Sequence, residues 1–333
     1  IEISDEEEIG ANAAILLHDI GHGPYSHALE NTIVQGVNHE SIGLQIMRNL
    51  NKEFDGALSL AIEIYTGKYP VQFLHQLVSS QLDTDRLDYL KRDSFFTGVS
   101  EGVIGSERII KMLTVHNGNL AVEAKGIYSL EKFLIARRLM YWQVYLHKTV
   151  VSAEYLLMNI LLRAKELIAN GEELEASDSL RFLLKNEEAF DVSDSHVWLK
   201  HFLKLDDFDV LYSIKQWVDS EDKLISNMCK RLINRQLLKV KILDRPLTDD
   251  QLNNLREKAA KTLNHDLKDT RYLVFQNSLS NCAYSSGDES INILFKDGSS
   301  KDISEAASIF RFSSLEAIES KHFVYFPEEI SFQ

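Results

Sequence analysis

The stretch AILLHDIGHGPYSHALE, residues 14–30, places three histidines, an aspartate and a glutamate directly after an apolar run. The spacing predicts a helix over residues 11–19 that ends at the adjacent pair His18 and Asp19. The glycines and proline of GHGP then break the chain, and Pro24 suits the first turn of a second helix. This part of the sequence therefore predicts imidazole and carboxylate groups gathered at a helix end.

Imidazole and carboxylate are the usual ligands of Mn, Fe, Ni, Zn or Mg, so His18 and Asp19 form a candidate metal-binding pair. His22 follows in the turn, and His27 and Glu30 are three residues apart on one face of the expected second helix. A single histidine at a helix end is usually a cap or a core residue. Four of the eleven histidines fall between positions 18 and 39, however, and this clustering favours a functional site.

A second segment, SSQLDTDRLDYLKRDS, carries Asp85, Tyr89 and Asp93 at intervals of four residues. This spacing places them on one face of a predicted helix. Taken alone, a solvated helix with salt bridges explains the pattern. Tyr89 and Leu82 on the same stripe instead indicate a partly buried face, where carboxylates need a metal or another cation.

A third segment, LIARRLMYWQVYLHKT, puts Arg137, Tyr141 and Tyr145 on one helical face, with Lys148 near it. An arginine followed by aromatic residues suits a triphosphate and a sugar or base, because a guanidinium binds phosphate oxygens and aromatic rings stack. An amphipathic helix with a cationic edge explains the same pattern without a ligand.

Composition limits the class of protein. The 333 residues are 44% apolar and 26% charged, which is typical of globular chains rather than disordered, fibrous or membrane ones. The formal charge of -14 argues against a surface that holds nucleic acid through its phosphates. No apolar window approaches about 18 residues and no signal-peptide pattern is visible. With only two cysteines, we expect a cytoplasmic protein without a membrane partner.

Helical spacing dominates residues 6–168, and residues 127–170 contain neither Gly nor Pro, which predicts one very long helix or two joined by a short turn. A loop is expected over 170–179, and helical spacing resumes over 202–218 and 226–243. After residue 269, short β-branched and aromatic runs alternate with turn residues, which indicates a small α+β domain. The predicted fold class is mainly α, with a helical domain over 1–168, a helical extension over 169–268 and a C-terminal α+β domain over 269–333.

The segments HDIGHGPYSH, NHE, DTDRLDYLKRD and RRLMYWQVYLHK occur in that order within residues 8–165. Together they resemble the HD-domain phosphohydrolases, most closely the deoxynucleoside triphosphate triphosphohydrolase (dGTPase-like) branch. The resemblance implies an HD domain over 1–168 and hydrolysis of a dNTP to a deoxynucleoside and tripolyphosphate. It also implies a nucleotide substrate, an activating nucleotide and a homo-oligomer, either a dimer or a tetramer.

The resemblance implies a role for each matching residue, with one divalent metal of the set Mn, Mg, Fe, Ni or Zn. The matches are His18, Asp19 and Asp85 to the metal ligands; His22, His27, Glu30 and His39 to the cluster that activates water and protonates the leaving oxygen; and Arg86, Tyr89, Asp93, Arg137 and Tyr145 to positions that contact phosphates and sugar.

One departure concerns the family's first metal histidine, which lies a few tens of residues before the HD pair. No histidine precedes His18 here, and the chain opens at Ile1 without a Met. We expect this ligand to lie upstream of Ile1 rather than to have been lost, because the rest of the motif is intact.

Two other functions stay open. Another HD-type phosphohydrolase, acting on nucleoside monophosphates or cyclic dinucleotides, would use the same metal ligands with a different pocket. A non-catalytic nucleotide sensor on an HD fold would bind without turnover. The long HDIGHGPYSH motif and the helix that carries Arg137 favour the triphosphohydrolase. Some relatives bind single-stranded nucleic acid, which the acidic charge makes a poor match here.

Overall fold

The computed structural model describes residues 2–30, 32–33, 38–185, 196–282, 284–285, 290–307 and 319–332, without the side chains of His27 and His196. Its contacts divide the chain into two compact units that interleave along the sequence. The first unit comprises 1–20, 43–147 and 280–320, and the second comprises 21–42, 148–279 and 321–333. The domain boundaries predicted at residues 168 and 268 stay predictions. Each of the two units contains segments that are distant from one another in sequence.

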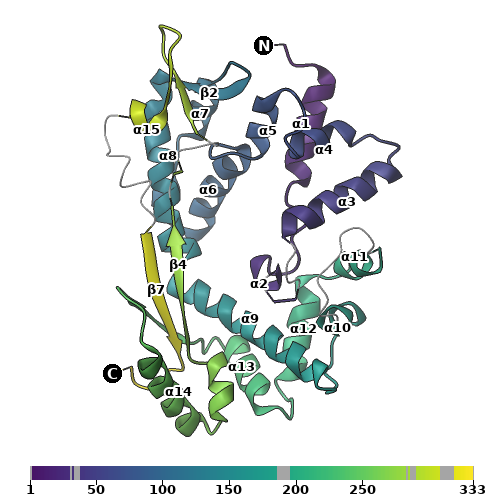
Figure 1. The fold of residues 1–333 in the computed structure, drawn as a ribbon, viewed down its shortest axis with the longest axis vertical. Coiled ribbons are helices and arrows are strands. Elements are labelled where there is room, and N and C mark those ends of the chain that lie inside the picture. Colours follow the sequence, from purple (N-terminus) through teal and green to yellow (C-terminus); the bar gives the residue numbers. More distant parts are fainter. Residues whose placement is uncertain are drawn as a thin grey trace. The chain divides into compact units, whose positions relative to one another are not determined.

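The first unit is mostly helical, with one small sheet (Figure 1). Its elements are α1 (Asp5–Leu17), most of α3 (His39–Glu53), α4 (Ser59–Tyr65), α5 (Gln72–Val78), α6 (Thr84–Thr97), η1 (Ser100–Gly102), α7 (Ser106–Met112), β1 (Leu113–His116), β2 (Asn119–Glu123), η2 (Ala124–Gly126), α8 (Ile127–Met140), the π-helical segment η3 (Tyr141–Tyr145), β5 (Asn292–Leu294), β6 (Ser300–Asp302) and α15 (Ile303–Ala306).

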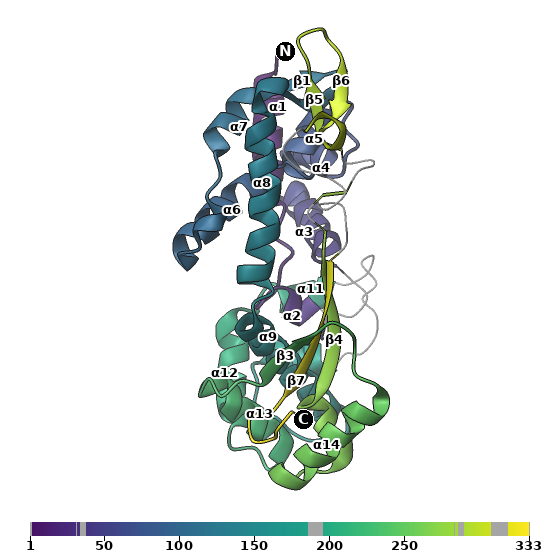
Figure 2. The same ribbon diagram turned by 90° about the vertical axis from the view of Figure 1, so that its left-hand side faces the viewer.

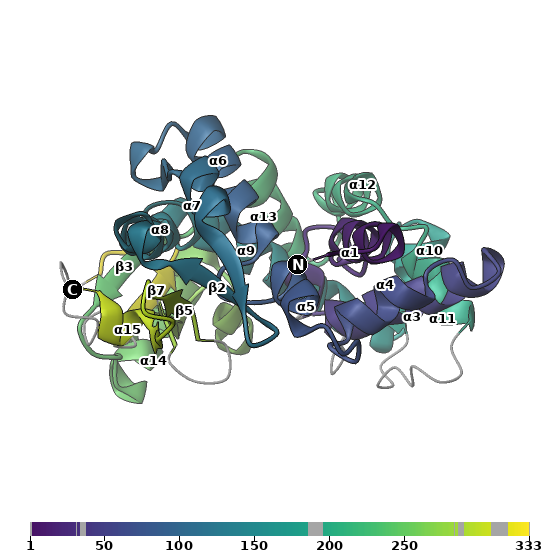
Figure 3. The ribbon, with the colours of Figure 1, turned by 90° about the horizontal axis from the view of Figure 1, so that it is seen from above.

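Helix α1 begins with a capping box. Ser4 Oγ accepts a hydrogen bond from the backbone N–H of Glu7 at 3.2 Å, and the Glu7 carboxylate accepts one from the backbone N–H of Ser4 at 2.8 Å. Acidic residues fill the first turn, where the partial positive charge of a helix N-terminus favours them. The helix packs against α4 and α5 (Figure 3) and ends at Leu17, so that His18 follows directly, close to the predicted end.

A hairpin interrupts the segment that was expected to be helical. Strands β1 and β2 pair antiparallel and are joined by Asn117 and Gly118, whose φ angles are 51° and 78°. Two consecutive positive φ values define the turn type that Asn-Gly favours in hairpins, so this dipeptide was the available signal. β2 also pairs in parallel with β5, and the sheet order is β1-β2-β5-β6.

The stretch without Gly or Pro forms two helices, which confirms the second of the two predicted forms. The 14-residue helix α8, visible along its length in Figure 2, passes into η3, and a 22-residue helix, α9 (Lys148–Ala169), follows. Helix α8 anchors the core of the first unit, because Leu130, Phe133 and Leu134 are fully buried there beside Leu90 of α6.

The second unit packs helices around α9 and a three-stranded sheet. Its other elements are α2 (His27–Glu30), α10 (Asp178–Lys185), α11 (His196–Phe202), α12 (Asp207–Trp217), α13 (Lys223–Ile233), β3 (Lys239–Leu243), α14 (Asp249–Leu263), η4 (Leu267–Tyr272), β4 (Phe275–Asn281) and β7 (Glu319–Phe326), of which β7 begins in the first unit.

The expected helix over 226–243 is wrong at its end, because α13 stops at Ile233 and β3 follows. β3 pairs antiparallel with β7 along its whole length, and this pairing overrides the helical spacing. The sheet order is β3-β7-β4. The predicted class is confirmed: the chain is mainly helical with an α+β C-terminal region, whose strands complete two sheets begun by earlier strands. Among the described residues, no helix is long and apolar enough to cross a membrane.

Candidate active site

His18 stands at the C-terminal cap of α1 with its ring fixed by the helix. Its Nδ1 donates to the carbonyl oxygen of Ile15 at 2.7 Å, which leaves Nε2 to face two carboxylates. Nε2 is 3.3 Å from Asp19 Oδ2 and 3.9 Å from Asp85 Oδ2. A backbone carbonyl on one ring nitrogen is the usual way to orient a metal-binding histidine.

His18, Asp19 and Asp85 fit a divalent cation. Their ligand atoms all lie within 4.8 Å of one another, and an imidazole nitrogen with two carboxylate oxygens is a donor set that transition metals accept. The Asp85 carboxylate, against partial burial, raises the pKa of His18 to about 9, and His18 in turn holds the pKa of Asp85 below its usual range. His18 and Asp85 thus stabilise a positive charge between the imidazole ring and the carboxylate.

Asp83, a buried residue that the sequence analysis missed, caps the N-terminus of α6 just before Asp85 and Arg86. Asp83 caps α6 and accepts from the backbone N–H of Arg86 at 2.7 Å. Arg86 Nη1 also contacts the Asp83 carboxylate and the carbonyl of Ser80. An Asp before a helical run is a standard capping signal that would have identified it. Arg86 therefore already has protein partners for part of its guanidinium.

The predicted face of α6 is half-buried, as expected, with exposed Asp88 and Arg92 on another face of the helix. Tyr145 donates its hydroxyl hydrogen to Asp93 Oδ2 at 2.7 Å, and its ring meets that of Tyr89 edge to face at 6.0 Å. Burial raises the pKa of Tyr89 to about 12, against the opposing charges of nearby arginines. Both phenols therefore stay neutral at physiological pH.

Arg137 lies one helical turn before η3, and its guanidinium acts electrostatically on Tyr89. The side-chain atoms Nε and Nη1 are buried, and within the described ranges neither has a hydrogen-bond partner. Buried polar groups in folded proteins are almost always paired, and a guanidinium presents a fork that matches phosphate oxygens. Arg137 thus offers two donors to an anion.

The predicted catalytic residues His22, His27, Glu30 and His39 belong to the second unit, near the turn that contains Pro24. Pro24 does not begin a helix as expected: Tyr25 and Ser26 both adopt the left-handed region, with φ of 53° and 45°, and α2 starts only at His27. Such conformations cost non-glycine residues about 1 kcal/mol or more each and concentrate at functional sites. The backbone N–H of Tyr25 donates to Asp207 Oδ1 of α12 at 3.1 Å, which helps to hold this turn.

Three of the four predicted catalytic residues contact one another within this unit. The rings of His22 and His39 stack with centroids 3.9 Å apart. Glu30 accepts a hydrogen bond from the backbone N–H of His39 at 3.1 Å and lies 3.3 Å from its Nδ1. A carboxylate on Nδ1 orients an imidazole for proton transfer at Nε2. The side chain of His27 lies outside the described residues.

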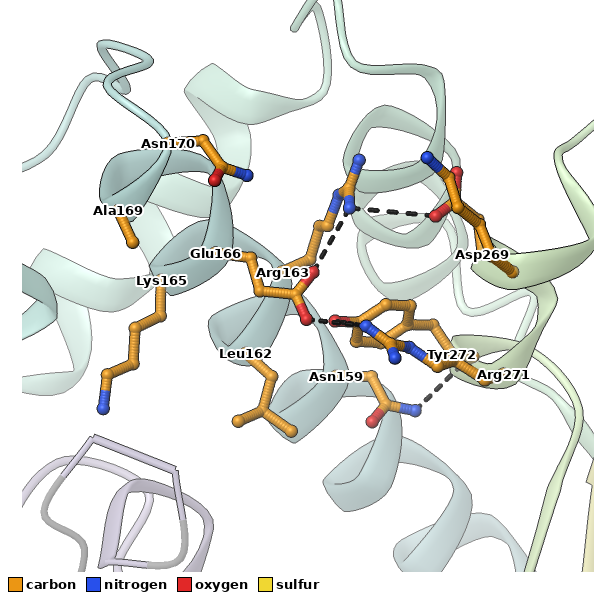
Figure 4. A pocket seen from close by; sticks show the side chains of 11 residues that line it. Asn159, Leu162, Arg163, Lys165, Glu166, Ala169, Asn170, Asp269, Arg271 and Tyr272 are labelled. Carbon is orange, nitrogen blue, oxygen red and sulfur yellow. Dashed lines mark hydrogen bonds and ion pairs between the residues drawn. The ribbon is translucent and has the colours of Figure 1, made fainter. Parts of the chain in front are cut away.

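One cavity of the second unit contains none of the predicted site residues. It measures about 910 Å³ and is crossed by an ion-pair network between α9 and η4 (Figure 4). Arg163 Nη1 is 3.2 Å from Glu166 Oε2 and 3.8 Å from Asp269 Oδ1, and Arg271 Nη2 is 2.8 Å from Glu166 Oε1. Because these charges neutralise one another, the network is better explained by stabilisation of the fold than by a ligand.

Comparison with known proteins decides the family. A model described as the HD domain matches residues 3–93, and one described as an HD associated region matches 104–183. YwfO of Bacillus subtilis, itself uncharacterized, is 30% identical over 99% of this chain and 76% of its own length. A phosphohydrolase crystal structure from Bacteroides thetaiotaomicron superposes with a TM-score of 0.94 at 48% identity, covering 98% of this chain and 82% of that one. The chain belongs to the HD-domain phosphohydrolase superfamily.

This HD-domain phosphohydrolase also matches a deoxynucleoside triphosphate triphosphohydrolase SAMHD1 homolog of Dictyostelium discoideum. The identity there is 26%, over 53% of this chain and 37% of the relative. The HD match includes His18, Asp19 and Asp85, and the associated region includes Arg137 and Tyr145. The residues predicted from the sequence motifs thus fall inside the matched segments.

Proposed function

We propose that this protein hydrolyses deoxynucleoside triphosphates to a deoxynucleoside and tripolyphosphate. One observation carries the proposal: Arg137 keeps two buried guanidinium donors without a partner among the described residues, in the same unit as a His/Asp group suited to a metal. A polyphosphate supplies the acceptors that such donors need. The match to the Dictyostelium triphosphohydrolase supports the same substrate class.

In the proposed reaction, water adds to the α-phosphorus and the bond from this phosphorus to the 5′ oxygen breaks. The water oxygen then remains on the tripolyphosphate, and the 5′ oxygen receives a proton. A divalent metal held by His18, Asp19 and Asp85 would supply Lewis acidity at a phosphate oxygen. His27 or His39 would transfer the proton, and Glu30 would orient His39 through Nδ1.

The chain's own groups supply binding and selectivity. Arg137 would neutralise phosphate charge with the two donors that have no partner among the described residues, and Arg86 would add positive charge while bound to Asp83. Tyr89 would pack against the sugar, with the Tyr145–Asp93 hydrogen bond beside it. A close fit at the ring of Tyr89 would reject the 2′-hydroxyl of ribonucleotides. An activating nucleotide and a homo-oligomer are part of the same proposal.

Product analysis tests this function. Each dNTP and NTP is incubated singly and in pairs with Mn²⁺ or Mg²⁺, and the products are separated by chromatography. Deoxynucleoside with tripolyphosphate is the expected result, and a need for paired nucleotides would add activation. Orthophosphate or pyrophosphate would instead indicate another HD-type reaction, and no turnover under any pairing would favour a nucleotide sensor.

Two variants separate metal binding from proton transfer. Asp85→Ala is expected to lose bound metal and turnover together, because it removes a carboxylate ligand. His27→Ala is expected to abolish turnover while metal content stays unchanged. Elemental analysis measures the bound metal, and initial rates measure turnover. Retained turnover in either variant would contradict the role assigned to that residue.

Substitution of Arg137 tests the observation on which the proposal rests. Arg137→Gln should raise the KM for a dNTP more than about tenfold, since it removes charge-assisted bonds to phosphate. Arg92→Gln is the matched control, because Arg92 is an exposed arginine that forms a helical i,i+4 ion pair with Asp88 on another face of α6. Equal kinetic constants for both variants would contradict the assignment.

A further inference from the structure

The first residue of β7 contacts the end of α8. One carboxylate oxygen of Glu319, Oε2, accepts a hydrogen bond from Arg138 Nη2 at 2.9 Å and another from Trp142 Nε1 at 3.1 Å. All three residues belong to the first unit. The side chains of Arg138 and Glu319 are 23% and 35% exposed, so the pair is partly shielded from water. One carboxylate therefore joins two residues that are four apart on the same helix.

These two contacts lie on either side of a change in helix type. Arg138 is in the last α-helical turn of α8, and Trp142 is in the π-helical segment η3. The backbone N–H of Leu146 donates to the carbonyl of Tyr141 at 2.7 Å, the five-residue step of a π-helix. Such segments are rare and occur frequently at functional sites. The Glu319 carboxylate thus bridges the junction between the α and π geometries.

The junction sets the direction of the neighbouring side chains. Arg137 and Tyr141, each one residue before a Glu319 partner, precede Tyr145 along the adjacent face. A slip of one residue at the junction would rotate the following side chains by about 100°. Tyr145 would then lose its hydrogen bond to Asp93 and its edge-to-face contact with Tyr89 of α6, whose ring centroid is 6.0 Å away.

We propose that Glu319 is a positioning residue that, through Arg138 and Trp142, holds Arg137 and Tyr145 in the orientation that binds the nucleotide. This inference rests on the proposed function of the site. Glu319 lies 177 residues beyond Trp142 in sequence, and its hydrogen bonds to Arg138 and Trp142 attach it to the helix that carries Arg137. Its effect on the substrate would therefore pass through the helix.

Glu319→Gln tests the proposal, because the amide keeps the shape of the side chain and removes its charge. The KM for the best dNTP should rise about tenfold with a smaller change in kcat, since small displacements of binding groups are costly. The affinity for inorganic tripolyphosphate, titrated by calorimetry, should fall by a similar factor. Glu319→Asp keeps the charge and should recover part of both losses.

Glu329→Gln is the matched control. Glu329 accepts from the buried Arg231 at 2.6 Å in the second unit, so this variant also breaks an arginine–carboxylate pair. It should leave KM and tripolyphosphate affinity unchanged even if the melting temperature falls. A fluorescence change in Glu319→Gln that disappears in a Trp142→Phe background would locate the effect at η3.

Unchanged KM and unchanged tripolyphosphate affinity in Glu319→Gln would overturn the proposal, as would equal losses in Glu329→Gln. Absence of dNTP turnover in the wild-type protein would refute the proposed function alone, because the tripolyphosphate titration still reads the orientation of Arg137. Absence of both turnover and tripolyphosphate binding in the wild type would refute both.

Discussion

At the scale of single residues, the tautomer of His18 determines which of its ring nitrogens can bind a metal. Because Nδ1 donates to a carbonyl, only Nε2 is available to a proton or a metal, and both compete for it. The Asp85 carboxylate raises the pKa of His18 to about 9 in the metal-free protein, so His18 carries a proton at neutral pH. A metal must displace that proton.

We therefore predict that binding of Mn²⁺ releases a proton at pH 7. Between the ordinary histidine pKa and pH 9, the apparent affinity should rise up to about tenfold per pH unit and then level off. Calorimetry in buffers of different ionisation enthalpy measures the proton count. Asp85→Asn, titrated without metal, supplies the control, because the pKa of its His18 should lie nearer the ordinary value. An affinity independent of pH over this interval would count against His18 as a ligand.

At the scale of elements, the packing of η1 between α6 and α8 leaves no room for a side chain at Gly102. A methyl group there would lie 2.7 Å from Met140 Sδ and 2.8 Å from Ser94 Cβ, and Met140 is fully buried next to η3. The lack of a side chain at Gly102 therefore allows the close packing of η1 against α6, which carries Asp93, and against α8, which carries Arg137.

Gly102→Ala should lower the free energy of unfolding by about 1–3 kcal/mol, the usual cost of overpacking a close contact. Urea titration measures the change. Gly105→Ala is the control in the same loop, because a methyl group there meets nothing within 4 Å. Equal unfolding free energies for the two variants would show that α6 and α8 can move apart without loss of stability.

At the scale of the whole molecule, ion pairs join segments of the second unit that are distant in sequence. Arg163 of α9 lies 2.6 Å from Asp222, the cap of α13, and both side chains are 15% exposed. Burial works to raise the pKa of Asp222, but the hydrogen bond from Arg163 holds it below its usual range. The charge of Asp222 therefore stabilises the folded state above the unfolded carboxyl pKa, and this contribution is lost as pH falls through the lower folded pKa.

Asp222→Asn retains a capping side chain but removes the charge, and should cost about 1–3 kcal/mol of unfolding free energy at pH 7. The difference from wild type should shrink in acid, where Asp222 itself becomes protonated. Lys268→Gln, which breaks an exposed pair with Asp266, is expected to change stability by less than about 0.5 kcal/mol. Chemical denaturation at pH 7 and pH 3 compares the variants, and a constant difference would exclude the ion pair as the cause.

The sequence by itself determined the features that depend on local order. The HDIGHGPYSH motif, a helix that carries Asp85, Tyr89 and Asp93 on one partly buried face, and helical structure over residues 127–170 follow from spacing within a few residues. The choice between one long helix and two over 127–170 was left open by the sequence and came from the structure. Capping and amphipathic periodicity depend on residues a few positions apart, so they can be recognised in a single sequence. The Asn117–Gly118 dipeptide is also a local signal for the hairpin, but the sequence analysis expected helical structure there.

Only the tertiary structure decided features that join distant segments. The pairing of β3 with β7, the parallel contact of β2 with β5 and the Glu319 contacts to η3 link residues that no local pattern connects. The two Arg137 donors that have no partner among the described residues, and the pairing of Arg86 with Asp83, likewise emerged only from the folded arrangement. The physical reason is that burial and hydrogen-bond partners depend on which segments meet in space, and that choice is made by the whole chain.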